Sequence, residues 1–174
     1  MTASTTDSTF IDHLRRALDG DRKRGERAAL RRYWSPATRS QAYPILGQLG
    51  ALNDSRTAIL AALYAEHPVH QSGLTVGKAA AGLGDRKEGE HPFDRHFRRL
   101  LSCQEIGHTH EPGDLATQLH RLVKRLDREG IGLDYAALHK NLNFWKNYRD
   151  KVLLGWASDF WGAPVPSTQA ITES

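Results

Sequence analysis

The chain has 174 residues, 39% of them hydrophobic and 25% charged, so it is long enough to bury a core as one large or two small helical domains. Its formal net charge of +4 is mildly basic, and this value alone does not establish binding to nucleic acid. The single cysteine, Cys103, excludes an intramolecular disulfide and favours a reducing, cytoplasmic setting, and no apolar segment is long enough for a membrane-spanning helix, so we expect no membrane partner.

The first half of the chain has the apolar periodicity of short amphipathic helices. We expect these helices near residues 10–18, 26–33, 41–49, 55–66 and 75–83. Gly20 ends the first helix and Pro36 stops the second. Asp54 is placed to cap the start of the fourth. Residues 84–91 are rich in glycine and charge, and we interpret them as a connection between two halves of the chain.

The second half continues the helical pattern after Pro92, a residue that suits the first turn of a helix. Residues 105–112 are expected to form a loop. The clearest helix spans about 112–129, because its apolar residues recur at i, i+4, i+7, i+8 and i+11, and Gly130 then ends it. After it we expect a short helix that Asp134 caps and that runs through residue 142, and a last helix at 144–161.

No strand pattern competes with these helices, so we predict an all-α protein. The predicted organisation is an N-terminal helical bundle at 8–83, the connection at 84–91, a C-terminal helical bundle at 92–162 and a disordered tail at 163–174.

Cationic residues gather on leucine-rich helical segments. Between residues 11 and 39 there are nine Arg and Lys residues against four acidic ones, a local excess larger than that of the whole chain. A second cluster recurs at i, i+3, i+4 and i+7 along one ridge of a predicted helix, namely Arg121, Lys124, Arg125 and Arg128. Phosphates require several neighbouring donors of this kind, but a solvated helix face produces the same pattern. The residues alone therefore leave both interpretations open.

Aromatic residues of the last predicted helix are expected to form core rather than to stack on bases. Trp145, Val152, Trp156 and Phe160 share a single wide face, which is typical of a buried stripe. Trp161 lies off that stripe and is the best candidate among these residues for stacking on a nucleic-acid base.

No catalytic or metal-binding arrangement accompanies the cations. Cys103, His108 and His110 lack the paired spacing of zinc ligands, and no fourth ligand is evident. The chain has no P-loop, nucleophile elbow, zinc-protease motif or dinucleotide fingerprint. We therefore expect no catalytic residue, no cofactor and no metal.

An ordered series of short motifs runs through almost the whole chain. In chain order they are AALRR at 28–32, YP at 43–44, LTVGKAA at 74–80, RxFxxLL at 95–101, the basic helix at 119–126, GIGLDY at 130–135, and Trp145 followed by WAxxF at 156–160. Each motif is short, but their order and spacing together resemble the CasB family, the small subunit of the type I-E CRISPR surveillance complex Cascade.

This resemblance implies a fold, partners and a function. Members of the family are all-helical, with an N-terminal and a C-terminal bundle, and have no known catalytic activity. Two copies lie head to tail in Cascade against the subunits that carry the crRNA, and the complex also contains a large subunit. Basic surfaces help to hold the R-loop, including the displaced non-target DNA strand. Carried over by motif, the nucleic-acid-binding candidates are Arg31, Arg32, Lys78, Arg95, Arg99, Arg121, Arg125, Lys146 and Arg149.

Two other functions fit the same basic, all-helical chain. One is a stand-alone helical module that binds RNA or DNA by itself. The other is a structural spacer whose arginines pair with acidic surfaces of protein partners. An enzyme of an unrecognised type is the least supported option, because no candidate nucleophile or acid–base pair accompanies the cations.

Overall fold

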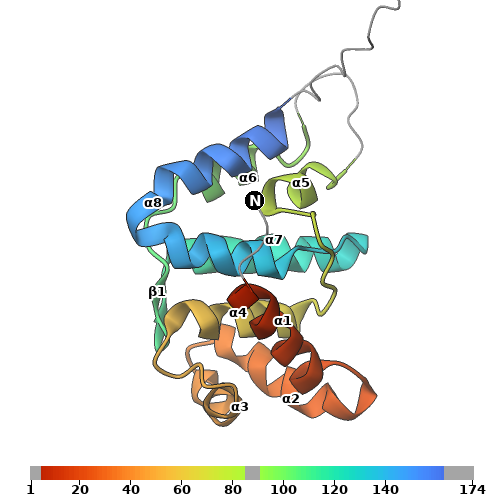
Figure 1. Ribbon diagram of the computed structural model, residues 1–174, viewed down its shortest axis with the longest axis vertical. Coiled ribbons are helices and arrows are strands. Elements are labelled where there is room, and N and C mark those ends of the chain that lie inside the picture. The colour runs from red at the N-terminus through yellow and green to blue at the C-terminus, as the bar shows by residue number, and fades with distance from the viewer. Residues whose placement is uncertain (1–4, 85–90, 163–174) are drawn as a thin grey trace, which may run out of the picture.

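Helices make up most of the computed structural model, which describes residues 5–84 and 91–162 (Figure 1). The α-helices are α1 (Thr5–Leu18), α2 (Arg24–Arg31), α3 (Tyr43–Gln48), α4 (Ser55–Glu66), α5 (Val76–Ala81), α6 (Asp94–Leu101), α7 (Asp114–Glu129) and α8 (Tyr135–Trp161). Short 3-10 helices are η1 (Asp21–Lys23), η2 (Arg32–Trp34) and η3 (Arg39–Ala42). The only strands in the described ranges are β1 (Gly107–His108) and β2 (Glu111–Pro112). The predicted all-α class is confirmed.

Side-chain caps fix the starts of three helices. Asp54 Oδ1 accepts a hydrogen bond from the backbone N of Arg56 at 3.1 Å, so the predicted helix at 55–66 and its cap are confirmed. Thr75 caps α5, and Asp134 caps α8. Burial alone would raise the pKa of the Asp54 carboxyl, but hydrogen bonds from Arg56 and Thr57 outweigh burial and hold this pKa below its usual value.

The predicted loop at 105–112 contains a small antiparallel hairpin. Gly107 pairs with Pro112, and His108 pairs with Glu111. Gly107 has a φ of 89°, and a Cβ there would lie 2.1 Å from the backbone N of Gly113, so only glycine fits this close approach. With two residues in each strand, the hairpin has no room for the alternation of apolar and polar residues by which strands are recognised.

The predicted break between the last two helices was wrong in position. Helix α8 runs from Tyr135 to Trp161 and bends at Tyr148, where φ is −134° and ψ is 30°. Residues 141–144 include neither glycine nor proline, so nothing there removes a backbone hydrogen bond or favours an end to the helix. The chain is therefore helical through residues 142–144, and the helix is interrupted at Tyr148 instead.

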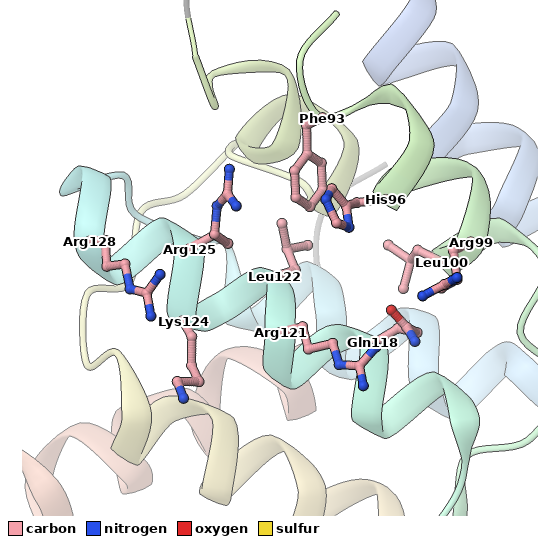
Figure 2. A pocket seen from close by; sticks show the side chains of 10 residues that line it. All are labelled: Phe93, His96, Arg99, Leu100, Gln118, Arg121, Leu122, Lys124, Arg125 and Arg128. Atoms are coloured by element: carbon pink, nitrogen blue, oxygen red, sulfur yellow. The ribbon is translucent and has the colours of Figure 1, made fainter.

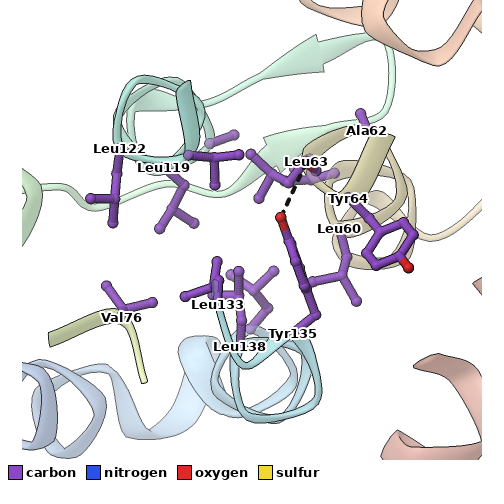
Figure 3. Packing of buried hydrophobic residues seen from close by; sticks show 14 of the residues in the cluster. Leu60, Ala62, Leu63, Tyr64, Val76, Leu119, Leu122, Leu133, Tyr135 and Leu138 are labelled. Atoms are coloured by element: carbon purple, nitrogen blue, oxygen red, sulfur yellow. Dashed lines mark hydrogen bonds between the residues drawn. The ribbon is translucent and has the colours of Figure 1, made fainter. Parts of the chain in front are cut away.

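Buried residues of α4, α7 and α8 meet in the centre of the molecule (Figure 3). Leu63 of α4 and Leu119 of α7 are fully buried there, as is Tyr135 of α8. The Tyr135 hydroxyl donates to the backbone O of Leu63 at 3.5 Å and to that of His67 at 2.6 Å. These carbonyls belong to the C-terminal end of α4, so the bonds tie the end of α4 to the start of α8.

Helix α8, from the second half of the chain, packs against helices of the first half. It contacts α1, α4 and α5, and the buried apolar residues form one cluster from α1 to α8. The division into bundles at 8–83 and 92–162 remains a prediction, and the predicted tail at 163–174 lies outside the described residues, as does most of the connection at 84–91. Figure 1 shows α1 to α4 at one end, α5 and α6 near the C-terminal part of α8 at the other, and α7 between them.

The aromatic residues of the predicted stripe on α8 are confirmed as core, whereas Val152 of the same stripe is only partly buried. Trp145, Trp156 and Phe160 are buried, whereas Trp161 is 38% exposed. The Trp161 Nε1 donates to Asp94 Oδ1 at 2.7 Å, and the guanidinium of Arg98 lies 5.3 Å from the centre of the Trp161 ring. Trp161 therefore joins the end of α8 to the first turn of α6.

Candidate nucleic-acid interface

A groove of about 360 Å³ runs between α6 and α7 (Figure 2). Five cationic residues line it: Arg99 from α6, and Arg121, Lys124, Arg125 and Arg128 from α7. Phe93, Leu100 and Leu122 supply apolar surface between the cations. Within the part of the chain that the structure describes, no aspartate or glutamate lines the groove. It is therefore a concave surface whose only full charges are positive.

The periodicity of α7 explains why its cations face the groove. Buried residues Leu119, Leu122 and Leu126 recur along the inner side of the helix. The positions between them are exposed and carry the i, i+3, i+4, i+7 ridge that the sequence predicts. The guanidinium carbon of Arg125 lies 5.8 Å from the centre of the Phe93 ring, a cation–π contact that holds this side chain across the groove.

Several arginines of the molecule are held in ion pairs, whereas the groove cations are not held by any described acidic side chain. Within the described ranges, none of the five takes part in an ion pair. By contrast, Arg98 on α6 bonds the Asp94 carboxylate, and Arg24 pairs with Asp21 at 3.6 Å. Unpaired cations that lie close together repel one another, so an anion bound among them relieves that repulsion.

Positive charge extends from α7 toward α2 around Glu66. His120 Nε2 lies 3.2 Å from Glu66 Oε2, and this hydrogen bond holds the pKa of the carboxyl below its usual value against the opposing effect of burial. Lys124 and Arg31 lower the same pKa further through their charges. Arg31 of α2 and Lys124 of the α7 ridge therefore both act on the charge of Glu66.

The other predicted residues do not line the groove. Arg95 is exposed on α6, and Lys78 is exposed on α5. Arg32 is exposed and donates to the side-chain oxygen of Gln41. Lys146 lines a second hollow of about 860 Å³ between the start of α4, the hairpin and α8. The structure therefore brings three of the nine predicted residues into one groove, namely Arg99, Arg121 and Arg125.

Arg149 also lines the second hollow, but its guanidinium is largely engaged inside the molecule. Its Nε and Nη2 donate to the backbone O of Cys103 at 2.9 and 2.6 Å, just after α6 ends. The side chain is 24% exposed, and its guanidinium carbon lies 5.6 Å from the centre of the Trp145 ring. A guanidinium here satisfies a carbonyl that helix α6 leaves beyond its end. This role leaves Arg149 fewer donors for a phosphate.

Two groove cations, Lys124 and Arg128, were not among the predicted binding residues. Both belong to the sequence ridge of α7, so their spacing from Arg121 and Arg125 was the signal that could have found them. Their place opposite α6 could not be read from that spacing, because it depends on how the two helices pack.

The described residues do not assemble a metal-binding centre. No three of their His, Cys, Asp or Glu side chains lie close enough together to hold a metal ion. Cys103 is buried, and burial raises the pKa of its thiol to about 11, which disfavours the reactive thiolate. Among the described helices, none combines the length and apolar character needed to cross a membrane.

Comparison with known proteins identifies the family. The model of the CRISPR-associated protein Cse2 family matches residues 26–161. CasB from Thermus thermophilus has 25% identity and a TM-score of 0.70, over 92% of this chain and 100% of that one. A second structure, of a Cse2-family protein from the same species, has 25% identity and a TM-score of 0.71, again over 92% of this chain and 100% of that one. CasB from Thermobifida fusca has the same fold, with 22% identity and a TM-score of 0.68 over 93% and 100% of the two chains. A search of curated proteins found no match. The chain therefore belongs to the Cse2 family of CRISPR-associated proteins, also named CasB.

Proposed function

We propose that the chain is a non-catalytic small subunit of a type I-E CRISPR Cascade complex and that it stabilises the R-loop through sequence-independent contacts with nucleic acid. The observation that carries this proposal is the α6–α7 groove, where five cations converge and no acid lines the surface within the described residues. Membership of the Cse2 family supports the place in a CRISPR complex. The proposed partners are the large subunit, the crRNA-carrying backbone subunits, a second copy of the chain placed head to tail, crRNA and target DNA, in the cytoplasm.

The chemistry of the groove suits phosphates better than base edges. Arginine and lysine bind phosphate oxygens through charge, which carries no sequence information. A displaced DNA strand has a different sequence for every target, so only contacts that do not depend on sequence, such as those to its backbone, can bind every displaced strand. Forming an R-loop exchanges one duplex for another of similar stability, so a few backbone contacts are enough to shift the balance.

Two experiments test this proposal. The first expresses the tagged chain with the neighbouring genes of its own genome and asks whether a crRNA-containing complex purifies with it. The second compares retention of target DNA by that complex between the wild-type chain and the variant Arg121→Ala/Arg125→Ala. We expect the complex to assemble with both chains and the variant to retain less DNA.

A matched control removes the same charge elsewhere. Arg22 and Arg24 are exposed near the start of α2 and do not line the groove, so Arg22→Ala/Arg24→Ala should retain DNA as the wild type does. Equal losses in the two variants would show that net charge, and not the groove, holds the strand. A groove variant that retains DNA but fails to join the complex would support the structural spacer instead. A lone chain that binds nucleic acid and purifies without partners would support the stand-alone module.

A further inference from the structure

Two aromatic rings lie on the solvent side of α8 and take no part in the core. Phe144 is 44% exposed and Tyr148 is 48% exposed, although large aromatic side chains are usually buried. They lie one helical turn apart, with ring centres 5.8 Å from each other and planes at 66°. Tyr148 is also the residue at which α8 bends. Trp145 and Trp156 of the same helix are buried, so the exposed pair forms a separate surface.

Lysines flank this pair on both sides along the helix. Phe144 and Tyr148 line a shallow hollow of about 440 Å³ together with Lys140 and Lys151. The ammonium group of Lys151 lies 5.5 Å from the centre of the Tyr148 ring. The other lining residues are Asn141 and Val152, and no acidic residue of the described chain lines the hollow. The surface therefore combines exposed π-faces with positive charge.

We propose that Phe144 and Tyr148 are a stacking platform for the bases of a single nucleic-acid strand, whose phosphates contact Lys140 and Lys151. Aromatic rings stack on any base, so such a platform tolerates every sequence. The two lysines match the charge of a polyanion, and a neutral or cationic protein surface would leave them without partners. Bases inside a duplex are already stacked on each other, so the platform favours an unpaired strand.

The platform rests on the proposed function only in assuming that the chain contacts nucleic acid. It adds a second site, on a different helix from the α6–α7 groove, and it assigns that site to bases rather than to phosphates alone. The platform also replaces Trp161 as the candidate for stacking on bases. Trp161 is held by Asp94 and Arg98, whereas the rings of Phe144 and Tyr148 contact each other and one lysine.

The test measures binding of the full chain to three labelled ligands of equal length by fluorescence polarisation. They are an oligothymidine strand, an abasic strand with the same phosphates, and a duplex. The variant is Phe144→Leu/Tyr148→Leu, which removes both rings and keeps apolar, helix-favouring side chains. We expect its affinity for oligothymidine to fall about tenfold, in line with the loss of base stacking. Its affinity for the abasic strand and for the duplex should not change.

Matched variants separate stacking from other effects. Phe144→Tyr/Tyr148→Phe keeps both rings and should bind oligothymidine as the wild type does. Leu154→Ala shortens a side chain that is 71% exposed on the same helix outside the hollow, and it should also leave binding unchanged. Arg121→Ala/Arg125→Ala should weaken binding of the oligothymidine and abasic strands alike, because those residues are assigned to phosphates. Circular dichroism confirms that each variant is folded.

The outcomes distinguish this inference from the proposed function. A wild-type chain that binds none of the three ligands would overturn the platform, whereas the proposed function is decided by DNA retention in the purified complex. Wild-type binding that the leucine variant does not weaken would overturn the platform alone, as would equal losses on the oligothymidine and abasic strands. A leucine variant with normal affinity for oligothymidine that no longer joins the complex would show that this surface contacts a protein, which also overturns the platform.

Discussion

Gly77 in α5 is where the packing of two helices depends most directly on the absence of a side chain. A Cβ built at this position would lie 2.3 Å from the backbone O of Trp156 and 2.7 Å from the Cβ of Asp159, both in α8. The backbone oxygen cannot rotate away, so Gly77→Ala requires α5 and α8 to separate. Gly155, in α8 itself, has nothing within 4 Å of its Cβ position and provides the matched control.

The two substitutions should change the free energy of unfolding in opposite directions. Replacing glycine by alanine inside a helix stabilises by about 1 kcal/mol, because alanine loses less backbone entropy on folding. At Gly155 this gain is unopposed. At Gly77 the steric conflict costs about 1–3 kcal/mol, as for other overpacked cores, and more if the helix backbones cannot shift. We therefore expect Gly77→Ala to be destabilising by up to about 2 kcal/mol after the helix gain of about 1 kcal/mol is subtracted from the steric cost.

Thermal unfolding followed by circular dichroism measures both effects. For a chain of this size, 1 kcal/mol shifts the Tm by about 2–4 °C. The Tm should fall by several degrees for Gly77→Ala and rise slightly for Gly155→Ala. A Gly77→Ala protein with a Tm equal to or above that of the wild type would refute the close packing of α5 on α8. Equal shifts in both variants would show that helix propensity alone decides the outcome.

Three further predictions concern the groove, a helix cap and a buried hydroxyl. In salt titrations of strand binding, Arg121→Ala/Arg125→Ala should flatten the log–log slope by about 0.7 for each single-strand phosphate that the variant no longer binds, and an unchanged slope would contradict the groove assignment. Asp54→Ala should lower the free energy of unfolding by about 1 kcal/mol at neutral pH. Because the folded pKa of Asp54 is lowered, its contribution is present above the unfolded pKa and is lost as the pH falls through the folded value, so urea unfolding of wild type and variant should converge in acid. Tyr135→Phe should be destabilising by about 1–3 kcal/mol in urea, because it leaves the buried carbonyl of His67 without this donor.

Helix positions were largely predictable because their signals are local. The cap at Asp54 and the left-handed Gly130, with a φ of 67°, began or ended helices where the sequence predicted. The bend at Tyr148 was missed because no proline or glycine marks it. The hairpin at Gly107 was missed because two-residue strands are too short to carry a periodic pattern.

The candidate site was predictable only in part, because its two walls come from different helices. The spacing on α7 predicted a cationic ridge, and the RxFxxLL motif carried Arg99 on α6. The convergence of these residues on one groove depends on the packing of α6 against α7, which separate helical periodicities do not specify. The platform at Phe144 and Tyr148 was missed for a similar reason, because a helix pattern alone does not show which face a neighbouring element leaves open.

The net charge counts every arginine equally, but in the folded chain some arginine side chains bond backbone carbonyls and others do not. The side chain of Arg27 donates to the backbone O of Leu18 and of Gly20, at the end of α1. Arg39 donates to the backbone O of Tyr33 at 2.9 Å. Such guanidinium groups stabilise helix ends and loops, and a phosphate would have to compete with those bonds. The α7 ridge makes no ion pair within the described residues, so a chain with a modest net charge of +4 still carries a concentrated cluster of cations on this helix. The distribution of hydrogen bonds among arginines, rather than the number of arginines, is therefore the physical basis on which we propose an interface on this helix.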